Sequence, residues 1–495
     1  MFLGAWLAAS GGCNCLIDAD KYRGGPSGDG GGMDGAENLP DGTSPPDGRI
    51  ESDAGPIEPT SAREGEGSGT GAPPVVIVLR GREFEPDATA SVVRSGDDTD
   101  LVDGPAVVAT DGSMIAIPIR IPIYDDLDET ETTSLEISVD GVLVDTLVVE
   151  GLLEADLAGT VDTTMLRPLY SSITTTANVT FAGASPAILR SASDITITNV
   201  IDGSGEESTD GVSGGVPGPG GCAGGDVHLA GQCSIGGGEP GGTQVTTGTG
   251  GGGGGHATNG TGGASGGDGG QMTGSEFLVP LDQDGGNGGG GGGDGTTGSQ
   301  GAGGGGGGAI ELSAVGRVRV GAVVSANGGA GTDGDGALPA TAEGSGGGGS
   351  GGGILVRAIS VTGAGSLNAT GAAGGMAFNV GGAGANGRIR IDVATPSLPG
   401  VSVDPAPIRG PHWADDTESI VRDADFTATL YGEPNRTFAA NIDGSDPEDV
   451  ATNGSGTGNY PVTLEPGHNR ICAIVSPTQL TLPEAVRCLI VTFVP

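Results

Sequence analysis

Two stretches of this chain repeat one pattern of alternating apolar residues, and this repeat restricts the possible folds more than any other feature. The stretches run over 309–329 and 353–375. Superposed, they match apolar residues in three pairs: Ile310 with Ile354, Leu312 with Val356, and Ala314 with Ala358. Residues that are apolar at every second position are typical of β-strands with one buried face. The repeat therefore predicts stacked strand units, in which each unit supplies the wall that its neighbour needs.

Shorter versions of the pattern lie on either side of these stretches, at 187–203 and 387–393. Together they predict a Gly-rich repeat domain over 154–404. A long insertion dominated by glycine, about 203–308, separates the first unit from the second. Two interpretations of the insertion remain open. It is a disordered loop on one side of the stack, or its glycine runs pack as extended polyglycine segments against the stack, since glycine lets chain axes approach closely.

Glycine accounts for 105 of the 495 residues, without the strict every-third-residue spacing that collagen requires. The shorter Gly-rich joins at 328–336 and 371–387 are expected to form corners of the stack, where positive φ is needed. Aromatic residues make up only 3% of the chain, so no large conventional core is expected in its middle. The formal net charge of −42 repels nucleic acid and anionic membrane surfaces, so neither is expected as a partner.

The first residues are typical of an export signal: a short apolar core at 2–9 is followed by small residues. Ser10-Gly11-Gly12-Cys13 resembles the lipobox of bacterial lipoproteins, with Ser10 where that family usually has Leu. The resemblance implies lipidation of Cys13, which would be the only contact with a membrane. The alternative is an ordinary signal peptide that leaves Cys13 and Cys15 in a mature tail. After this signal (1–15), residues 16–73 have few apolar side chains and are expected to form a disordered tether.

The repeat domain lies between two β-rich modules. Residues 74–153 consist of short apolar runs separated by Gly and Asp turns, which predicts a small β-sandwich. The run 77–84, Ile-Val-Leu-Arg-Gly-Arg-Glu-Phe, resembles the opening of IPT/TIG-type immunoglobulin-like domains, and 111–119 resembles a later strand of that family. The resemblance implies a spacer or binding platform without catalytic groups. Residues 405–495 carry a second set of strand and turn patterns, which predicts a C-terminal β-sandwich.

Four cysteines are expected to form two disulfides. Cys472 and Cys488 lie in the last two predicted strands, which face one another if 477–483 is the hairpin loop. Cys222 and Cys233 close a short loop inside the Gly-rich insertion. Such pairs, without the CxxC spacing of metal sites, indicate an oxidising compartment. Reduced cysteines in a cytosolic protein are the alternative.

Few residues are candidates for a metal site. Asp282 and Asp284, and likewise Asp333 and Asp335, resemble the start of calcium loops, but neither pair continues to the glutamate of an EF-hand. An acidic loop, Asp125, Asp126, Asp128 and Glu129, is more typical of a solvated turn. The histidines stand far apart in the sequence: His228, His256, His412 and His468. Calcium is therefore the single cofactor considered, and no cofactor is the main expectation.

No catalytic constellation is found in the sequence. The GxGxxG matches lie within polyglycine, outside any βαβ unit, and are coincidental. Arginines of the repeat could line adjacent rungs as the basic stripe of a polysaccharide-cleaving enzyme: Arg317, Arg319, Arg357, Arg388 and Arg390. The alternative is that these arginines are solvated side chains at outward strand positions. We expect no catalytic residues.

The strand units resemble right-handed parallel β-helices of the pectin-lyase-like kind, and the whole layout resembles exported Gly-rich proteins of myxobacteria, mostly of unknown function. The expected fold is all-β, with a Gly-rich β-helix-like region between two immunoglobulin-like sandwiches. The expected function is that of a non-catalytic cell-surface protein, a lipid-anchored structural or adhesive stalk at the outer membrane or cell surface, or secreted. Its partners would be extracellular polysaccharide or other surface proteins. The alternatives are a β-helix lyase or glycosidase, and a calcium- or ice-binding module.

Overall fold

The structure is a computed structural model of the chain. It describes residues 51–53 and 75–495, apart from 82–83, 97–99, 120–131, 151, 168, 234–235, 243–247, 279–284, 295–298, 336–342, 395–397, 415–419 and 476–485. The predicted signal with Cys13, most of the predicted tether, the acidic loop at 125–129, and the pair Asp282 and Asp284 lie outside the described residues. One short piece of the predicted tether is not free of structure: β1 (Glu51–Asp53) pairs antiparallel with β2 (Val75–Arg80).

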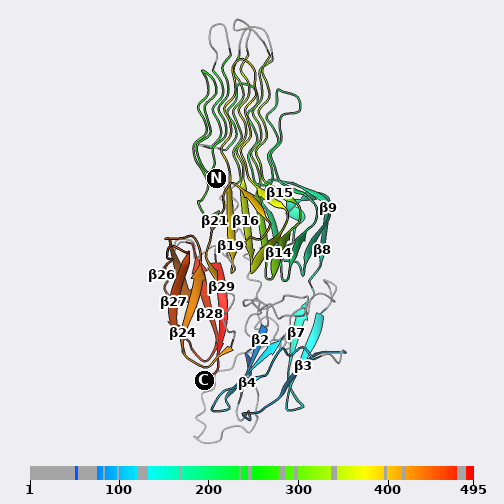
Figure 1. Cartoon of the computed structure of the whole chain (residues 1–495). Helices are drawn as coiled ribbons and strands as arrows, with labels where there is room; N and C mark the ends of the chain where they lie inside the picture. Colours follow the sequence, from blue (N-terminus) through cyan, green and yellow to red (C-terminus); the bar gives the residue numbers. More distant parts are fainter. Residues whose placement is uncertain are drawn as a thin grey trace, which may run out of the picture.

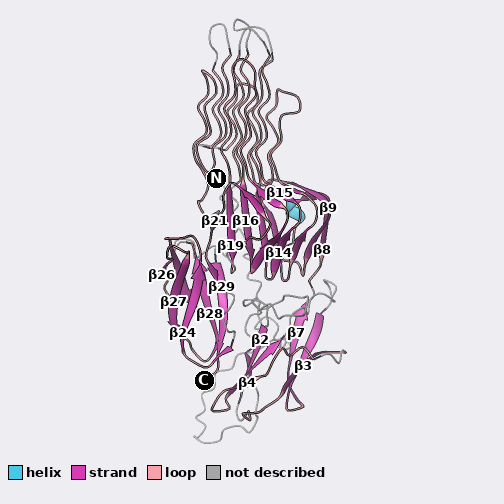
Figure 2. Cartoon of the chain, in the orientation of Figure 1, coloured by secondary structure: helices cyan, strands magenta, loops and turns pink. Residues whose placement is uncertain are grey.

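The described part of the chain is all-β (Figure 2). It contains no α-helix, and one 3-10 turn covers Thr163–Met165. A helix long and apolar enough to cross a bilayer is likewise missing from the described residues. Figure 1 shows two small β-modules at one end, a stack of strands in the middle, and a bundle of wavy extended segments at the far end.

The middle of the molecule is built from parallel strands that stack unit on unit. The units and the strands that flank them are β8 (Ala155–Asp162) and β9 (Ile173–Ala182); β10 (Ala187–Ser191), β11 (Ile195–Ile197) and β12 (Ile201–Asp202); β13 (Ala309–Ala314), β14 (Arg317–Val320) and β15 (Val323–Ser325); β16 (Gly353–Ala358), β17 (Ser360–Gly363) and β18 (Ser366–Asn368); and β19 (Arg388–Val393), β20 (Ser402–Asp404) and β21 (Ile408–Arg409). One sheet has the order β10-β13-β16-β19-β21, and the other has the order β17-β14-β11-β9-β12-β15-β18-β20 with β8 beside β9. Every pairing between these strands is parallel.

The register of the stack follows the sequence repeat. Ile310 lies opposite Ile354 and Leu312 opposite Val356, which confirms these two predicted pairs. Successive units place equivalent side chains in one continuous core, where they are almost fully buried: Leu189, Leu312, Val356 and Ile391. Because side chains alternate between the faces of a strand, the residues between them point to the opposite face of the sheet.

Two modules of mainly antiparallel sheets precede and follow the stack in the sequence. The N-terminal module has the sheets β1-β2-β5-β4 and β3-β6-β7, formed by β3 (Ala90–Arg94), β4 (Val107–Val108), β5 (Met114–Ile119), β6 (Thr132–Val139) and β7 (Val142–Glu150). The C-terminal module has the sheets β22-β24-β27 and β23-β29-β28-β25-β26, formed by β22 (His412–Trp413), β23 (Ile420–Val421), β24 (Asp425–Tyr431), β25 (Thr437–Ile442), β26 (Glu448–Ala451), β27 (Thr457–Thr463), β28 (Gly467–Ile474) and β29 (Val486–Phe493). In each module the two sheets share one apolar core.

The two modules contact one another at the end of the molecule remote from the glycine bundle (Figure 1). Val78 and Met114 pack with Val494 in a shared apolar cluster. The Thr110 amide donates to the carbonyl of Pro495, and the Arg80 guanidinium donates to the carbonyl of Pro466 at 2.6 Å.

The Gly-rich insertion is ordered in its described parts and forms, with the two joins, a bundle of extended segments. Hydrogen bonds between segments recur at every third residue: Gly301, Gly304 and Gly307 donate to Gly344, Gly347 and Ser350. A polyproline-II-like chain has three residues per turn and no internal hydrogen bonds, so its backbone groups must pair with neighbouring chains. The second interpretation of the insertion, packed polyglycine segments, is therefore correct, and we call this part the glycine bundle.

Interior segments of the glycine bundle are bonded on all sides. Segment 301–308 donates to segments 203–206, 222–225 and 344–350, and it accepts from segments 215–218, 286–289 and 329–332. All of its residues are buried. A backbone amide away from water needs such partners, because an unpaired one costs free energy comparable to a lost hydrogen bond.

Glycine in the bundle is needed for close approach rather than for turning. A Cβ placed on Gly349 would lie 2.0 Å from the carbonyl oxygen of Gly305, which is far inside van der Waals contact. The prediction that the joins 328–336 and 371–387 are positive-φ corners is wrong. None of their described glycines has positive φ: these glycines lie in extended segments of the bundle, and the turn inside 371–387 falls at 376–380, which contains no glycine.

On the outer segments of the glycine bundle, exposed residues follow the threefold repeat of the backbone. Along the segment 380–386, the exposed residues come at every third position: Val380, Ala383 and Asn386. The threefold repeat of the backbone thus decides which positions accept a side chain.

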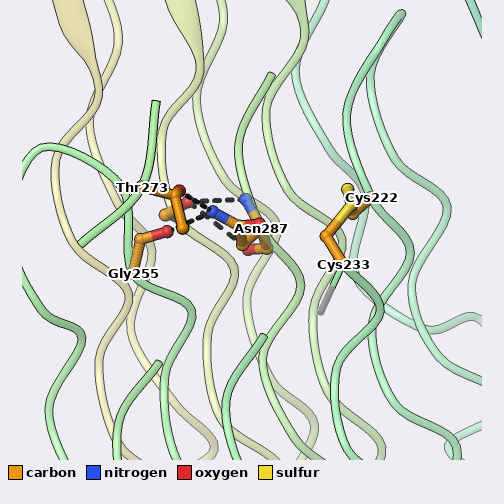
Figure 3. Close-up of a disulfide and its surroundings, with 6 residues drawn as sticks. Cys222, Cys233, Gly255, Thr273 and Asn287 are labelled. Carbon is orange, nitrogen blue, oxygen red and sulfur yellow. Dashed lines mark hydrogen bonds between the residues drawn. A yellow bond between two sulfur atoms is a disulfide. The ribbon is translucent and has the colours of Figure 1, made fainter. Parts of the chain in front are cut away.

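Both predicted disulfides are present in the structure. Cys472 and Cys488 lie opposite one another on β28 and β29. Cys222 and Cys233 join two neighbouring parts of the glycine bundle, and Figure 3 shows them beside Asn287. The Asn287 side-chain amide donates to the carbonyl of Gly255 and to Thr273 Oγ1, so a polar side chain adds a cross-link where the backbone leaves space.

Substitution of Gly349 by Ala is expected to destabilise the bundle by about 3 kcal/mol, because the new methyl overlaps backbone atoms that cannot move independently. Gly262→Ala is the matched control, since a Cβ there meets its nearest atom at 3.4 Å, an ordinary contact. Urea denaturation of the two variants measures the difference. Equal midpoints for Gly349→Ala and the wild type would contradict the close-packed bundle.

Candidate functional site

The strongest cluster of charged residues lies on the β10-β13-β16-β19 sheet, on the face opposite the apolar core. We call it the charge ladder, and its members come from four adjacent strands: Arg190, Glu311, Arg357, Arg390 and Asp392. Positive and negative side chains alternate along it, because the register places each carboxylate between arginines of its neighbours or of its own strand.

Glu311 holds the first half of the charge ladder together. Its carboxylate accepts two hydrogen bonds from Arg190, from Nε at 2.9 Å and from Nη2 at 3.1 Å. Arg357 Nη1 lies 3.7 Å from Glu311 Oε1, and Arg357 Nε lies 3.6 Å from Asp392 Oδ2. Paired hydrogen bonds between a guanidinium and a carboxylate are among the strongest in proteins.

Asp392 completes the second half. It accepts hydrogen bonds from Arg390 Nε at 2.8 Å and from Arg390 Nη2 at 2.6 Å. The side chains of both residues are fully buried. Charges removed from water in this way are tolerated only when they are paired and hydrogen-bonded.

A returning segment of the glycine bundle, residues 273–278, covers the charge ladder. Arg388 Nη1 donates to the carbonyl of Thr273 at 2.7 Å, and Arg390 Nη1 donates to the carbonyl of Phe277 at 2.8 Å. The Arg390 guanidinium also lies 5.9 Å from the centre of the Phe277 ring. Phe277 in turn packs edge-on against Phe438 of the C-terminal module, with ring centres 6.0 Å apart. The charge ladder therefore joins the stack, the bundle and the C-terminal module.

Burial and ion pairing shift the pKa of Glu311 in opposite directions. Burial alone raises the pKa of its carboxyl group, but attraction to Arg190 and Arg357 and hydrogen bonds from Arg190 and Ser313 outweigh this and lower the pKa from 4.5 to about 2. Glu311 is thus ionised at neutral pH, and its charge is committed to its neighbours.

The predicted basic stripe does not form. Arg317 and Arg319 lie on β14, in the other sheet, while Arg357, Arg388 and Arg390 belong to β16 and β19. The idea that the latter three are solvated is also wrong, because they are 4%, 9% and 0% exposed. Sequence spacing placed them at outward strand positions correctly, but it did not reveal the segment that covers that face.

The two candidate metal ligands that lie in the described residues, Asp333 and Asp335, accept hydrogen bonds from backbone amides. Asp333 Oδ1 accepts from the Met376 amide, and Asp335 Oδ2 accepts from the Ser299 amide at 3.3 Å. Across the described residues, no group of three or more His, Cys, Asp or Glu side chains is arranged to hold a metal ion. The histidines stay apart: His228 contacts Asp294, His256 is buried in the bundle, and His412 and His468 belong to the C-terminal module.

One small hollow lies where the stack meets the C-terminal module. It is lined in part by Ile391, Arg409, Tyr431 and Ser455, and it measures about 270 Å³ including the solvent at its mouth. The Arg409 amide donates to Glu433 Oε2 at 2.9 Å. The lining has no pair of groups placed to act as acid and base or as nucleophile and base.

Three exposed large apolar side chains of the glycine bundle lie close together in one turn. Met376, Phe378 and Val380 are 78%, 53% and 44% exposed. Sequence reasoning missed this turn, although one signal was available: 376–380, Met-Ala-Phe-Asn-Val, interrupts a run of glycine and alanine.

Comparison with models of known protein families, with curated proteins and with solved structures finds no match to this chain.

Replacement of Glu311 by Gln is expected to destabilise the protein by about 3 kcal/mol, because it removes the buried negative charge that lies between Arg190 and Arg357. Asp194→Asn is the control, since Asp194 pairs with Arg317 at 3.8 Å in a solvent-accessible position, where a salt bridge is worth less than about 1 kcal/mol. Urea denaturation of both variants tests this. Equal losses of stability in the two variants would show that the charge ladder does not help to hold the fold together.

Acid stability is expected to depend on Glu311. Its folded-state pKa lies below the ordinary 4.5, so the stabilisation is fully present above about pH 4.5 and is lost as the pH falls through about 2. The melting temperature should therefore fall across this window, and more steeply in the wild type than in Glu311→Gln. Hydrogen bonds from Ser113 also lower the pKa of Asp111, and those from Thr164 lower that of Asp162, but both carboxylates are common to the two proteins and cancel in the difference. If the melting temperatures of the wild type and Glu311→Gln fell equally between pH 4.5 and 2, Glu311 would not be the group responsible.

Proposed function

We propose that this chain is a non-catalytic, exported cell-surface protein that works as a rigid adhesive stalk, with a lipid on Cys13 as its anchor. In this proposal the stack is a β-helix of the pectin-lyase-like kind, and the two flanking modules are immunoglobulin-like spacers. The single observation that carries the proposal is the hydrogen-bonded lattice of the glycine bundle, which projects from the stack away from both modules (Figure 1).

The lattice supports a mechanical role because it leaves interior segments no freedom to move singly. Segment 344–352 donates at every third residue to segment 287–293, one residue later in each turn to segment 379–385, and two residues later to segment 326–332. Shifting one segment breaks bonds to several others at once. A bundle of this kind holds its far end at a fixed distance from the modules, which is what a stalk requires.

The composition of the surface supports contact with neutral or cationic surfaces outside the cell. The formal charge of −42 repels nucleic acid and anionic lipid. Both disulfides are consistent with an oxidising environment. Extracellular polysaccharide and other surface proteins are the partners that we propose.

The two alternatives have less support. A polysaccharide-cleaving enzyme would need accessible carboxylates and basic groups on adjacent rungs, whereas the arginines and carboxylates of the charge ladder are buried against one another. A calcium- or ice-binding module would depend on acidic loops or on a flat face of the bundle. The face formed by 258–264, 370–376 and 380–386 is free of charged residues, and it is the surface on which the ice-binding alternative would have to rest.

Retention under flow tests the proposed function. Beads that carry the full chain, attached through its N-terminal end, are expected to stay on surfaces coated with a panel of bacterial polysaccharides or with intact bacterial envelopes. Beads that carry Gly349→Ala should be released at lower flow, because the lattice is disturbed. The same preparations should release no reducing ends or unsaturated sugars. Loss of wild-type beads from every surface, or release of such products, would overturn the proposal.

A further inference from the structure

The turn 376–380, which we call the distal turn, stands at the end of the glycine bundle that is remote from the stack. It joins the outgoing segment 369–375 to the returning segment 381–387. Three of its five side chains are large, apolar and mostly exposed: Met376, Phe378 and Val380. Exposed apolar groups gathered in this way often mark an interaction site.

The backbone of the distal turn is fixed by polar side chains of neighbouring segments. The Met376 amide donates to Asp333 Oδ1, and the Ala377 amide donates to Ser345 Oγ at 3.1 Å. Asn379 is 8% exposed, and its side-chain amide donates to the carbonyl of Gly248 at 2.5 Å. The Ser345 amide donates back to the carbonyl of Asn379 at 3.0 Å.

This arrangement presents the three apolar side chains on a rigid support. Covering them on binding would gain free energy in proportion to the apolar area removed from water. A backbone that is already fixed loses little entropy on association, so more of that gain remains as affinity. The one polar side chain of the turn, that of Asn379, is buried and hydrogen-bonded, whereas Met376, Phe378 and Val380 are exposed.

The surroundings of the distal turn are acidic. Asp333 contacts it directly, Asp335 follows two residues later, and both are exposed. The segments 326–335 and 369–387 contain no Lys or Arg. A complementary partner therefore offers an apolar pocket with cationic side chains at its rim.

Resting on the stalk function above, we propose that the distal turn is its binding site for a protein partner that presents an apolar pocket bordered by Lys or Arg. A protein fits better than a sugar, because the turn offers Met, Phe and Val while its one amide side chain is buried and bonded. A protein also fits better than a bilayer, because the carboxylates and the net charge oppose an anionic lipid surface.

The test uses the full chain and three defined probes: a helical peptide of Leu and Lys, a polylysine peptide of equal charge, and phosphatidylcholine vesicles. The variant Met376→Ser/Phe378→Ser/Val380→Ser removes the apolar groups. The control Val212→Ser/Val216→Ser/Leu229→Ser removes three side chains of similar exposure, 53%, 59% and 56%, elsewhere on the bundle. Phe378→Ser alone serves if the triple variant does not reach the wild-type melting temperature.

The turn variant is expected to bind the Leu/Lys peptide about tenfold or more weakly than the wild type, as for loss of an interface hot spot. The control should match the wild type, and polylysine should bind all three proteins equally. Equal affinity of the turn variant for the Leu/Lys peptide would overturn the proposal. So would turn-dependent binding to the vesicles, or turn-dependent self-association in sedimentation, because each assigns the turn another occupant.

The two proposals fail separately. Wild-type beads that adhere to no surface, with the turn-dependent peptide affinity intact, overturn the stalk function alone. Beads that adhere normally, with no effect of the turn variant on peptide affinity, overturn the distal site alone.

Discussion

The hydrogen bond between backbones of separate segments is the interaction on which this molecule depends. In an extended chain with three residues per turn, the backbone N–H groups form no hydrogen bonds within their own segment. Each interior N–H must therefore donate to a carbonyl of a neighbouring segment. That pairing needs segments so close that a Cβ cannot be placed between them, as the 1.9 Å approach of a Cβ on Gly304 to the Gly329 carbonyl oxygen illustrates. Glycine content, burial without apolar side chains, and exposed residues at every third position all follow from this one requirement.

The stack of parallel strands provides the register from which the lattice starts. The backbone hydrogen bonds that join β12, β15 and β18 continue beyond the strands, where the Gly205 amide donates to the Asn327 carbonyl and the Gly328 amide donates to the Thr370 carbonyl. Neighbouring segments leave the stack already aligned, so the entropy of bringing them together is offset by the apolar core of the stack. On the other sheet of the stack, Arg390 of the charge ladder and the neighbouring Arg388 hold the returning segment 273–278.

The candidate sites differ in how far the sequence could predict them. The outward positions of Arg357, Arg388 and Arg390 follow from strand alternation, but their pairing with Glu311 and Asp392 depends on neighbours far away in the chain and on the segment that excludes water. The distal turn is visible in the sequence as apolar residues within glycine, yet its exposure depends on where the lattice ends. Cys472 and Cys488 could be paired from the hairpin pattern because their partners are local.

The sequence by itself determined the all-β character, the strand repeat and its register, because alternation of apolar residues is a local pattern with one burial solution. It left open whether the glycine runs are disordered or packed, and it misassigned the joins as corners. Only the tertiary structure showed that the glycine runs and the joins are packed segments. A glycine segment has no side chains, so its sequence contains no pattern that identifies the segments beside it. Its conformation is stabilised by hydrogen bonds to segments that lie as many as 131 residues apart, as between the Gly382 amide and the Gly251 carbonyl.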